Sequence, residues 1–235
     1  SFGFELETWS LAEKSDASLN AAAELFIAND FKLPYYYGAS HLAKLSSFNI
    51  QQFLQLAAEL FEETVSAHVI GQASALTVVR QENILNRASK KWWNQITERA
   101  AHPTRVRRLL ESIGVFSRSY TDRPTAPNDP GVNAIAISMA DRDRLLDPEW
   151  LKVRPEHKIL AEVLASALAH NYLDAQPNYK CKGQLWLVLN LNRLLCVRYR
   201  LPLNYGLFKE QRLDELVKWM DKGFEPKRAP EEELL

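Results

Sequence analysis

The sequence lacks the motifs that mark the commonest enzymes and membrane proteins. It has no GxxxxGK phosphate-binding loop, no HExxH zinc motif and no GxSxG nucleophile elbow, which are the patterns that bind nucleotide phosphates or build hydrolase sites. The longest apolar run, Leu185–Leu189, is too short to cross a bilayer, and the N-terminus has no signal-peptide pattern. We therefore predict a cytoplasmic chain without membrane contact that is not an enzyme by itself.

The sequence also has only two cysteines and a formal net charge of zero. Cys181 and Cys196 stand outside any CxxC or Cys/His cluster, so we predict two free, buried thiols and no metal site. The carboxylates around Asp141 and Asp143 alternate with arginines, which favours surface ion pairs over magnesium binding. Lysine and arginine together number 29, as do aspartate and glutamate, so the global charge favours neither nucleic acid nor a membrane surface.

Helical periodicity dominates the chain. Apolar residues recur every three or four positions from Ile50 to His68, with His68 expected as a packing residue, and Asn49 or Ser47 can cap this helix. Residues 134–138 are typical of a strand, whereas residues 174–183 fit either a hairpin-like wing or a loop. Further helices are expected at residues 16–30, 38–46, 76–97, 104–113, 155–171, 185–199 and 213–220. The apolar start of residues 185–199 is also compatible with a strand.

Two segments resemble one known family. YYYGASHLAKLS followed by SFNIQQFL, at residues 35–54, is similar to the lid motif of bacterial origin-recognition-complex-like AAA+ ATPases, which are related to the STAND group. Residues 189–220, which contain LNRLLCVRYRLPLNYG, are similar to the C-terminal segment of the same ATPases. The resemblance implies a mainly α fold with a few short strands: a lid subdomain over residues 1–75, a winged-helix-like domain over 76–221 and a charged flexible tail over 222–235. The start at Ser1 suggests a piece of a longer polypeptide, with the ATPase core upstream.

The resemblance also implies a nucleotide-sensing position. In the family, an arginine of the lid motif reaches the nucleotide phosphates, because a guanidinium neutralises phosphate charge. Gln51 stands at the matching position here, close to Asn49, and a neutral amide bonds phosphate without supplying charge. We therefore expect weakened sensing and no cofactor in this chain, with ATP and magnesium bound by the parent ATPase. An ordinary capped amphipathic helix remains the alternative.

A local excess of positive charge supports nucleic-acid binding. Between residues 87 and 123 the chain has nine lysines and arginines against three acidic residues, enough to follow a phosphate backbone. Two expected helices joined at His102-Pro103 add a helix-turn-helix arrangement, with Thr104 near the start of the second. Trp92 and Trp93 point about 100° apart on one helix, so at least one belongs to the core. The candidate contacts are Lys90, Lys91, Arg105, Arg107 and Arg108; a solvated basic face is the alternative.

These patterns lead to two main hypotheses, beside which a free-standing enzyme is the third. In the first, the chain is a regulatory and docking region that couples the nucleotide state of an AAA+ or STAND ATPase to DNA or an effector protein. The family resemblance implies a setting in antiviral defence or mobile elements, and we expect a homo-oligomer. In the second, the chain is a helical interaction or oligomerisation scaffold that never binds DNA.

Overall fold

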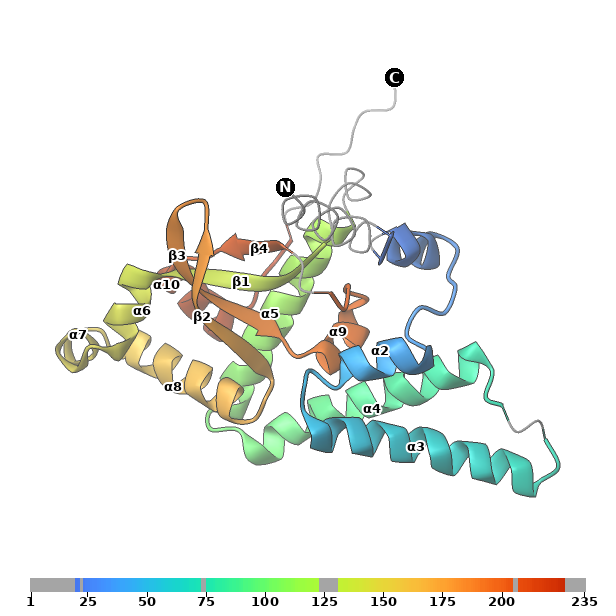
Figure 1. Cartoon of the computed structure of the whole chain (residues 1–235). Coiled ribbons are helices and arrows are strands. Elements are labelled where there is room, and N and C mark those ends of the chain that lie inside the picture. Colours follow the sequence, from blue (N-terminus) through green and yellow to red (C-terminus); the bar gives the residue numbers. More distant parts are fainter. Residues whose placement is uncertain (1–19, 22, 73–74, 123–130, 205–206, 227–235) are drawn as a thin grey trace, which may run out of the picture.

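The computed structural model describes residues 20–21, 23–72, 75–122, 131–204 and 207–226, and it is mainly helical with one small sheet (Figure 1). This confirms the predicted fold class. Residues 23–30 are helical. In chain order the elements that follow are α2 (Gly38–Leu45), α3 (Ile50–Val69), α4 (Val78–Arg99), α5 (Pro103–Thr121), β1 (Val132–Ser138), α6 (Met139–Leu146), α7 (Pro148–Val153), α8 (Pro155–Ala169), β2 (Leu173–Cys181), β3 (Gln184–Leu191), α9 (Arg193–Tyr199), β4 (Leu207–Glu210) and α10 (Leu213–Asp221).

Local capping and periodicity explain most helix bounds. The side chain of Asn49 accepts a hydrogen bond from the backbone N–H of Gln52, so Asn49 is the cap of α3. Pro103 occupies the first turn of α5, where a missing N–H costs nothing. That helix was predicted to end at Ile113 but continues to Thr121, because Phe116 extends its buried face.

The sheet corrects one prediction. Residues 185–199 were expected to be a helix, yet β3 occupies the first half and only α9 is helical. The strand order is β2-β3-β1-β4, in which β3 pairs antiparallel with β1 and β2, and β4 pairs parallel with β1. β3 is an inner strand whose second half is buried, and a buried strand has the continuous apolar sequence of a buried helix. The alternative of a hairpin over residues 174–183 is correct.

One hydrophobic core connects the helices with the sheet. Helices α5, α8 and α10 cover one face of the sheet, where Ile135 and Leu189 are fully buried (Figure 1). The same cluster contains Leu45 and Leu56 from the predicted lid and Leu85 from α4, so it crosses the predicted boundary at residues 75 and 76. The division into residues 1–75, 76–221 and 222–235 stays a prediction.

Some predictions fall outside the described residues. The start of the helix expected at residues 16–30, most of the loop expected at 121–133 and the end of the tail expected at 222–235 lie there. Both cysteines are free, but only Cys196 is buried, whereas Cys181 is partly exposed, which corrects the prediction of two buried thiols. Burial raises the pKa of the Cys196 thiol to about 12, so it stays protonated and unreactive. Within the described ranges, no helix is both long and apolar enough to cross a membrane.

Candidate functional site

The lid-like motif forms a left-handed turn that presents an aromatic ring. Ser47 and Phe48 both have positive φ, at 49° and 60°, which costs on the order of 1 kcal/mol for each residue other than glycine. The turn is held by the Ser47 hydroxyl, which accepts a hydrogen bond from the backbone N–H of Arg193 at 3.0 Å. Phe48 is 83% exposed, with the Arg193 guanidinium over its ring at 5.1 Å. The motif therefore points Phe48 outward beside the start of α3.

The residue after the predicted sensor position ties α3 to α9. Gln52 is buried, and its Nε2 donates to the Leu45 carbonyl at 2.7 Å. Gln52 and Asn192 exchange hydrogen bonds between their side-chain amides, each at 3.3 Å. Asn192 is also the cap of α9, since its Oδ1 accepts from the N–H of Leu194. This link was not predicted; the only sequence signal for it is an asparagine placed directly before the start of a helix.

The predicted sensing residues line a small hollow at the start of α3. Asn49 and Gln51 face it together with Arg99 from the end of α4, and its volume is about 250 Å³. Gln51 supplies no charge, so Arg99 is the source of positive charge in this hollow. Its other lining residues are mostly asparagines and glutamines, whose amide N–H groups can donate hydrogen bonds to a phosphate. Arg99 and these amides could hold a phosphate group, and no group of potential metal ligands occurs among the described residues.

One face of α3 is apolar and exposed. Ile50, Leu54, Phe61, Val65 and Val69 are between 43% and 77% exposed, and their spacing places them within an arc of about 100°. We call these five residues the α3 apolar face. The helix packs on α2 and α4 through its other side, where Leu56 and Ala67 are buried. His68 was predicted to pack in the core but is exposed. It lies on the apolar side of α3, and no described element covers that side.

A second hollow collects positive charge. It has a volume of about 390 Å³, and we call it the basic hollow. Trp93 forms its floor and is only 3% exposed, while the guanidiniums of Arg107 and Arg198 lie 5.2 and 4.6 Å from the centre of its ring. Arg108 also lines the hollow, and Glu111 is its one acidic residue. Three guanidiniums against one carboxylate attract an anion.

The structure separates the predicted nucleic-acid contacts. Arg107 and Arg108 meet in the basic hollow, with Arg107 donating to the Thr97 hydroxyl at 3.2 Å and Arg108 to the Asp221 carbonyl. Arg105 and Lys91 form ion pairs instead, Arg105 with Asp221 at 2.9 Å and Lys91 with Glu59 at 3.6 Å. Lys90 is exposed and has no ion-pair partner among the described residues. Arg198 was not predicted, because it lies on α9, far along the sequence from the basic stretch.

Three of the carboxylates considered for magnesium form ion pairs, whereas Asp143 has no ion-pair partner among the described residues. Asp141 pairs with Arg144 at 2.7 Å, Glu149 with Lys152 at 2.6 Å and Glu156 with Arg154 at 3.6 Å. Nearby, the indole N–H of Trp150 donates to Nδ1 of the buried His157, whose Nε2 lies 3.0 Å from Asp214. Because an indole can only donate, Nδ1 of His157 accepts this hydrogen bond.

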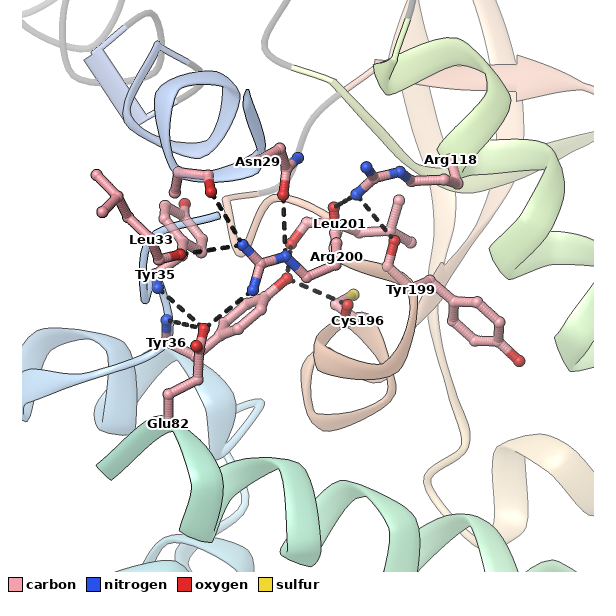
Figure 2. Close-up of polar contacts among 11 residues, drawn as sticks. Asn29, Leu33, Tyr35, Tyr36, Glu82, Arg118, Cys196, Tyr199, Arg200 and Leu201 are labelled. Carbon is pink, nitrogen blue, oxygen red and sulfur yellow. Dashed lines mark hydrogen bonds and ion pairs between the residues drawn. The ribbon is translucent and has the colours of Figure 1, made fainter. Parts of the chain in front are cut away.

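A polar cluster around Arg200 joins the predicted lid to the rest of the chain (Figure 2). The Arg200 guanidinium donates to Asn29 Oδ1 at 2.9 Å, to Glu82 Oε1 at 3.2 Å and to the Leu33 carbonyl at 3.2 Å. The same Glu82 oxygen accepts the backbone N–H groups of Tyr35 and Tyr36. We call these contacts the Arg200 cluster; they join residues 29–36 and α4 to the end of α9.

Tyr36 extends the Arg200 cluster into the core. Its hydroxyl is within hydrogen-bond distance of the carbonyls of Leu201, at 2.8 Å, and Cys196, at 3.2 Å, and donates to one at a time. Burial raises the pKa of Tyr36 well above its ordinary value, so the donor is retained. From α5, the Arg118 guanidinium donates to the Arg200 carbonyl at 2.8 Å (Figure 2). Polar contacts thus join the predicted lid to α4, to α9 and to Leu201.

Comparison with known proteins gives one match. A family model described as ORC-CDC6-like matches residues 10–206 of the chain. This range includes the lid-like motif, α3, the Arg200 cluster and α9, and it stops before β4 and α10. No curated protein and no solved structure matches the chain at a significant level.

Proposed function

The chain belongs to the ORC-CDC6-like family, and we propose that it is the region that couples the nucleotide state of an AAA+ ATPase core to a binding partner. The core would precede it in the same polypeptide and would bind ATP and magnesium. The chain itself would hydrolyse nothing, since its sequence has no phosphate-binding loop. A cytoplasmic setting, a link to the STAND group and a role in antiviral defence belong to this proposal through the family resemblance alone.

The observation that carries this proposal is the α3 apolar face. Its five large side chains lie in one stripe, and contiguous exposed apolar surface of this kind marks an interaction site. The stripe begins at the lid-like motif, next to the hollow that contains Asn49, Gln51 and Arg99. A core docked on this stripe would have its nucleotide close to that hollow. Asn49 and Gln51 would then sense the nucleotide weakly, with Arg99 supplying the charge that Gln51 lacks.

Rigid links would carry a displacement of α3 to the rest of the chain. The Gln52–Asn192 pair joins α3 to α9, and the Arg200 cluster joins residues 29–36 and α4 to the same helix. Elements connected in this way move together, so closure of the core on α3 would shift the opposite side of the chain as one body.

Hydrogen exchange of α3 in the polypeptide that includes the ATPase core tests the docking. We expect slow exchange of the α3 amides that changes on addition of ATP. Phe61→Asp places a charge in the middle of the α3 apolar face and should speed this exchange by at least about tenfold, as for other central interface residues. Phe31→Asp is the matched control, because Phe31 is also 68% exposed but lies outside α3.

Two results would contradict the docking proposal. One is α3 exchange that is the same in Phe61→Asp, Phe31→Asp and the unaltered polypeptide. The other is self-association of this chain that light scattering finds abolished by Phe61→Asp. The second result would support the alternative of an oligomerisation scaffold.

The basic hollow supports DNA as the partner. Three guanidiniums and only one carboxylate line it, so its net charge is positive and attracts phosphate groups. We expect Arg107→Glu to weaken the binding of duplex DNA by about tenfold and to reduce the salt dependence by about one released counterion per lost phosphate contact. Arg80→Glu is the control: Arg80 is paired with Glu63 at 2.8 Å, outside the hollow. A titration monitored by anisotropy at several salt concentrations measures both quantities. Identical curves for Arg107→Glu and the unaltered chain would exclude this contact and favour an effector protein.

A further inference from the structure

The sheet face opposite α5, α8 and α10 carries three aromatic residues on three different strands. The ring of Phe208 on β4 lies 5.6 Å from the ring of Tyr179 on β2 and 6.1 Å from that of Trp186 on β3, measured between centroids. The residues of β1 on this face are Ala134 and Ala136, over which Trp186 and Phe208 pack. Because alanine is small, the rings from both sides can meet above β1. We call Tyr179, Trp186 and Phe208 the aromatic platform.

A β-bulge places Tyr179 on this face. Gln176 pairs with Val188 and Tyr179 with Trp186, so β2 has one residue more than β3 between these pairs. The extra residue shifts the alternation of side chains, and without it Tyr179 would point to the helix-covered face. The bulge contains Asn178 at a φ of 61°, and the Arg142 guanidinium donates to its Oδ1 at 3.4 Å. Bulges commonly redirect a side chain at a functional site.

The tip of the hairpin is tight and positively charged. Lys182 and Gly183, with φ of 48° and 76°, form a two-residue turn of the type that matches strand twist. Lys180 and Lys182 are exposed and have no ion-pair partner within the described part of the chain. No aspartate or glutamate occurs between Pro177 and Leu191. The charge beside the aromatic platform is therefore complementary to a polyanion.

We propose that the aromatic platform binds single-stranded nucleic acid, with an unpaired base stacked on Tyr179 and with Lys182, in the turn of the hairpin, on a flanking phosphate. Tyr179 is 43% exposed and offers a ring surface to a ligand, while Phe208 packs edge-on against its ring. Aromatic rings beside lysines are the usual means of holding unpaired strands without sequence preference. A duplex cannot use such a ring in the same way, because its bases are already stacked inside the helix.

The aromatic platform is independent of the proposed coupling to an ATPase core. Residues of the strands form it, whereas residues from α4, α5 and α9 line the basic hollow. Loss of duplex binding in Arg107→Glu and loss of single-strand binding in Tyr179→Ala are therefore separate results. Failure of one leaves the other standing.

Anisotropy titrations of the chain with a labelled oligothymidine of about ten nucleotides test the proposal, since a strand of this length spans a typical single-strand site. We expect Tyr179→Ala to weaken binding by about tenfold, within the range measured for loss of one stacked base. Tyr179→Phe keeps the ring and should bind like the unaltered chain. Lys182→Ala should reduce the salt dependence by about one counterion.

Two controls keep the test specific. Phe31→Ala removes another exposed aromatic ring, one outside the sheet, and should leave oligothymidine binding unchanged. Circular dichroism of Tyr179→Ala checks that this variant still folds. If it does not fold, the test uses Tyr179→Phe, which removes only the hydroxyl and should bind oligothymidine like the unaltered chain. Equal affinity of Tyr179→Ala and the unaltered chain for oligothymidine overturns the proposal. Failure of the unaltered chain to bind oligothymidine, or equal weakening by Phe31→Ala, also overturns it.

Discussion

Replacing Arg200 by alanine is expected to lower the free energy of unfolding by about 2–3 kcal/mol. The change leaves the Glu82 carboxylate, which is only 13% exposed, without its ion-pair partner and removes the donor to Asn29 and to the Leu33 carbonyl. Breaking a fully buried pair costs about 3–5 kcal/mol, and the lower value applies here because the Arg200 side chain is 31% exposed. Urea unfolding followed by circular dichroism measures the loss.

Arg200→Gly separates the side-chain contacts from the backbone. Arg200 has a φ of 52° at the end of α9, a conformation that glycine adopts about 1 kcal/mol more readily than other residues. Arg200→Gly loses the same hydrogen bonds as Arg200→Ala but should be about 1 kcal/mol more stable. Unfolding of Arg200→Ala at the same urea concentration as the unaltered chain would show that the Arg200 cluster does not stabilise the fold.

Gly114→Ala is expected to destabilise the protein by about 3 kcal/mol, although alanine is the better helix former by about 1 kcal/mol. A Cβ at this position of α5 would lie 2.4 Å from Cδ2 of Tyr199 and 2.5 Å from Cε2. The ring cannot retreat freely, because it packs edge-on against the buried Trp93 at 6.3 Å between centroids. Thermal denaturation should detect a lower Tm.

A double-mutant cycle identifies the cause of this loss. In a Tyr199→Ala background the ring is absent, so Gly114→Ala should cost nothing further or stabilise α5 slightly. If Gly114→Ala destabilised both backgrounds equally, the close approach of Tyr199 to α5 would not be the reason. A higher Tm for Gly114→Ala alone would contradict the packing of α9 on α5.

Local signals in the sequence predicted much of the fold. The cap at Asn49 and the apolar spacing after it predicted α3, because capping and periodicity are properties of consecutive residues. Periodicity could not distinguish strand from helix at residues 185–191, since an inner strand and a buried helix are both apolar throughout. It also identified the stripe on α3 without revealing that this stripe faces outward.

The candidate sites depend on contacts that local reasoning could not reach. Arg107 and Arg108 were predicted together, but Arg198 joins them only through the packing of α9 on α4. Arg105 belonged to the same charged stretch, yet Asp221 at the end of α10 pairs with it. In the same way, Asn49 and Gln51 were predicted from the motif, whereas Arg99 reaches their hollow from another helix. Each missing element depends on the tertiary arrangement of distant segments.

The long sequence separation between the Tyr36 hydroxyl and its acceptors affects folding during synthesis. It bonds carbonyl groups 160 and 165 positions further along the chain. A ribosome adding about 5–20 residues per second needs roughly 8–30 s to produce the chain between these partners. Through that interval the Tyr36 hydroxyl lacks both of its native acceptors. Newly synthesised chains should therefore depend on a holding chaperone until Leu201 has left the ribosome. If the chaperone releases the chain only after that point, the yield of folded protein should rise.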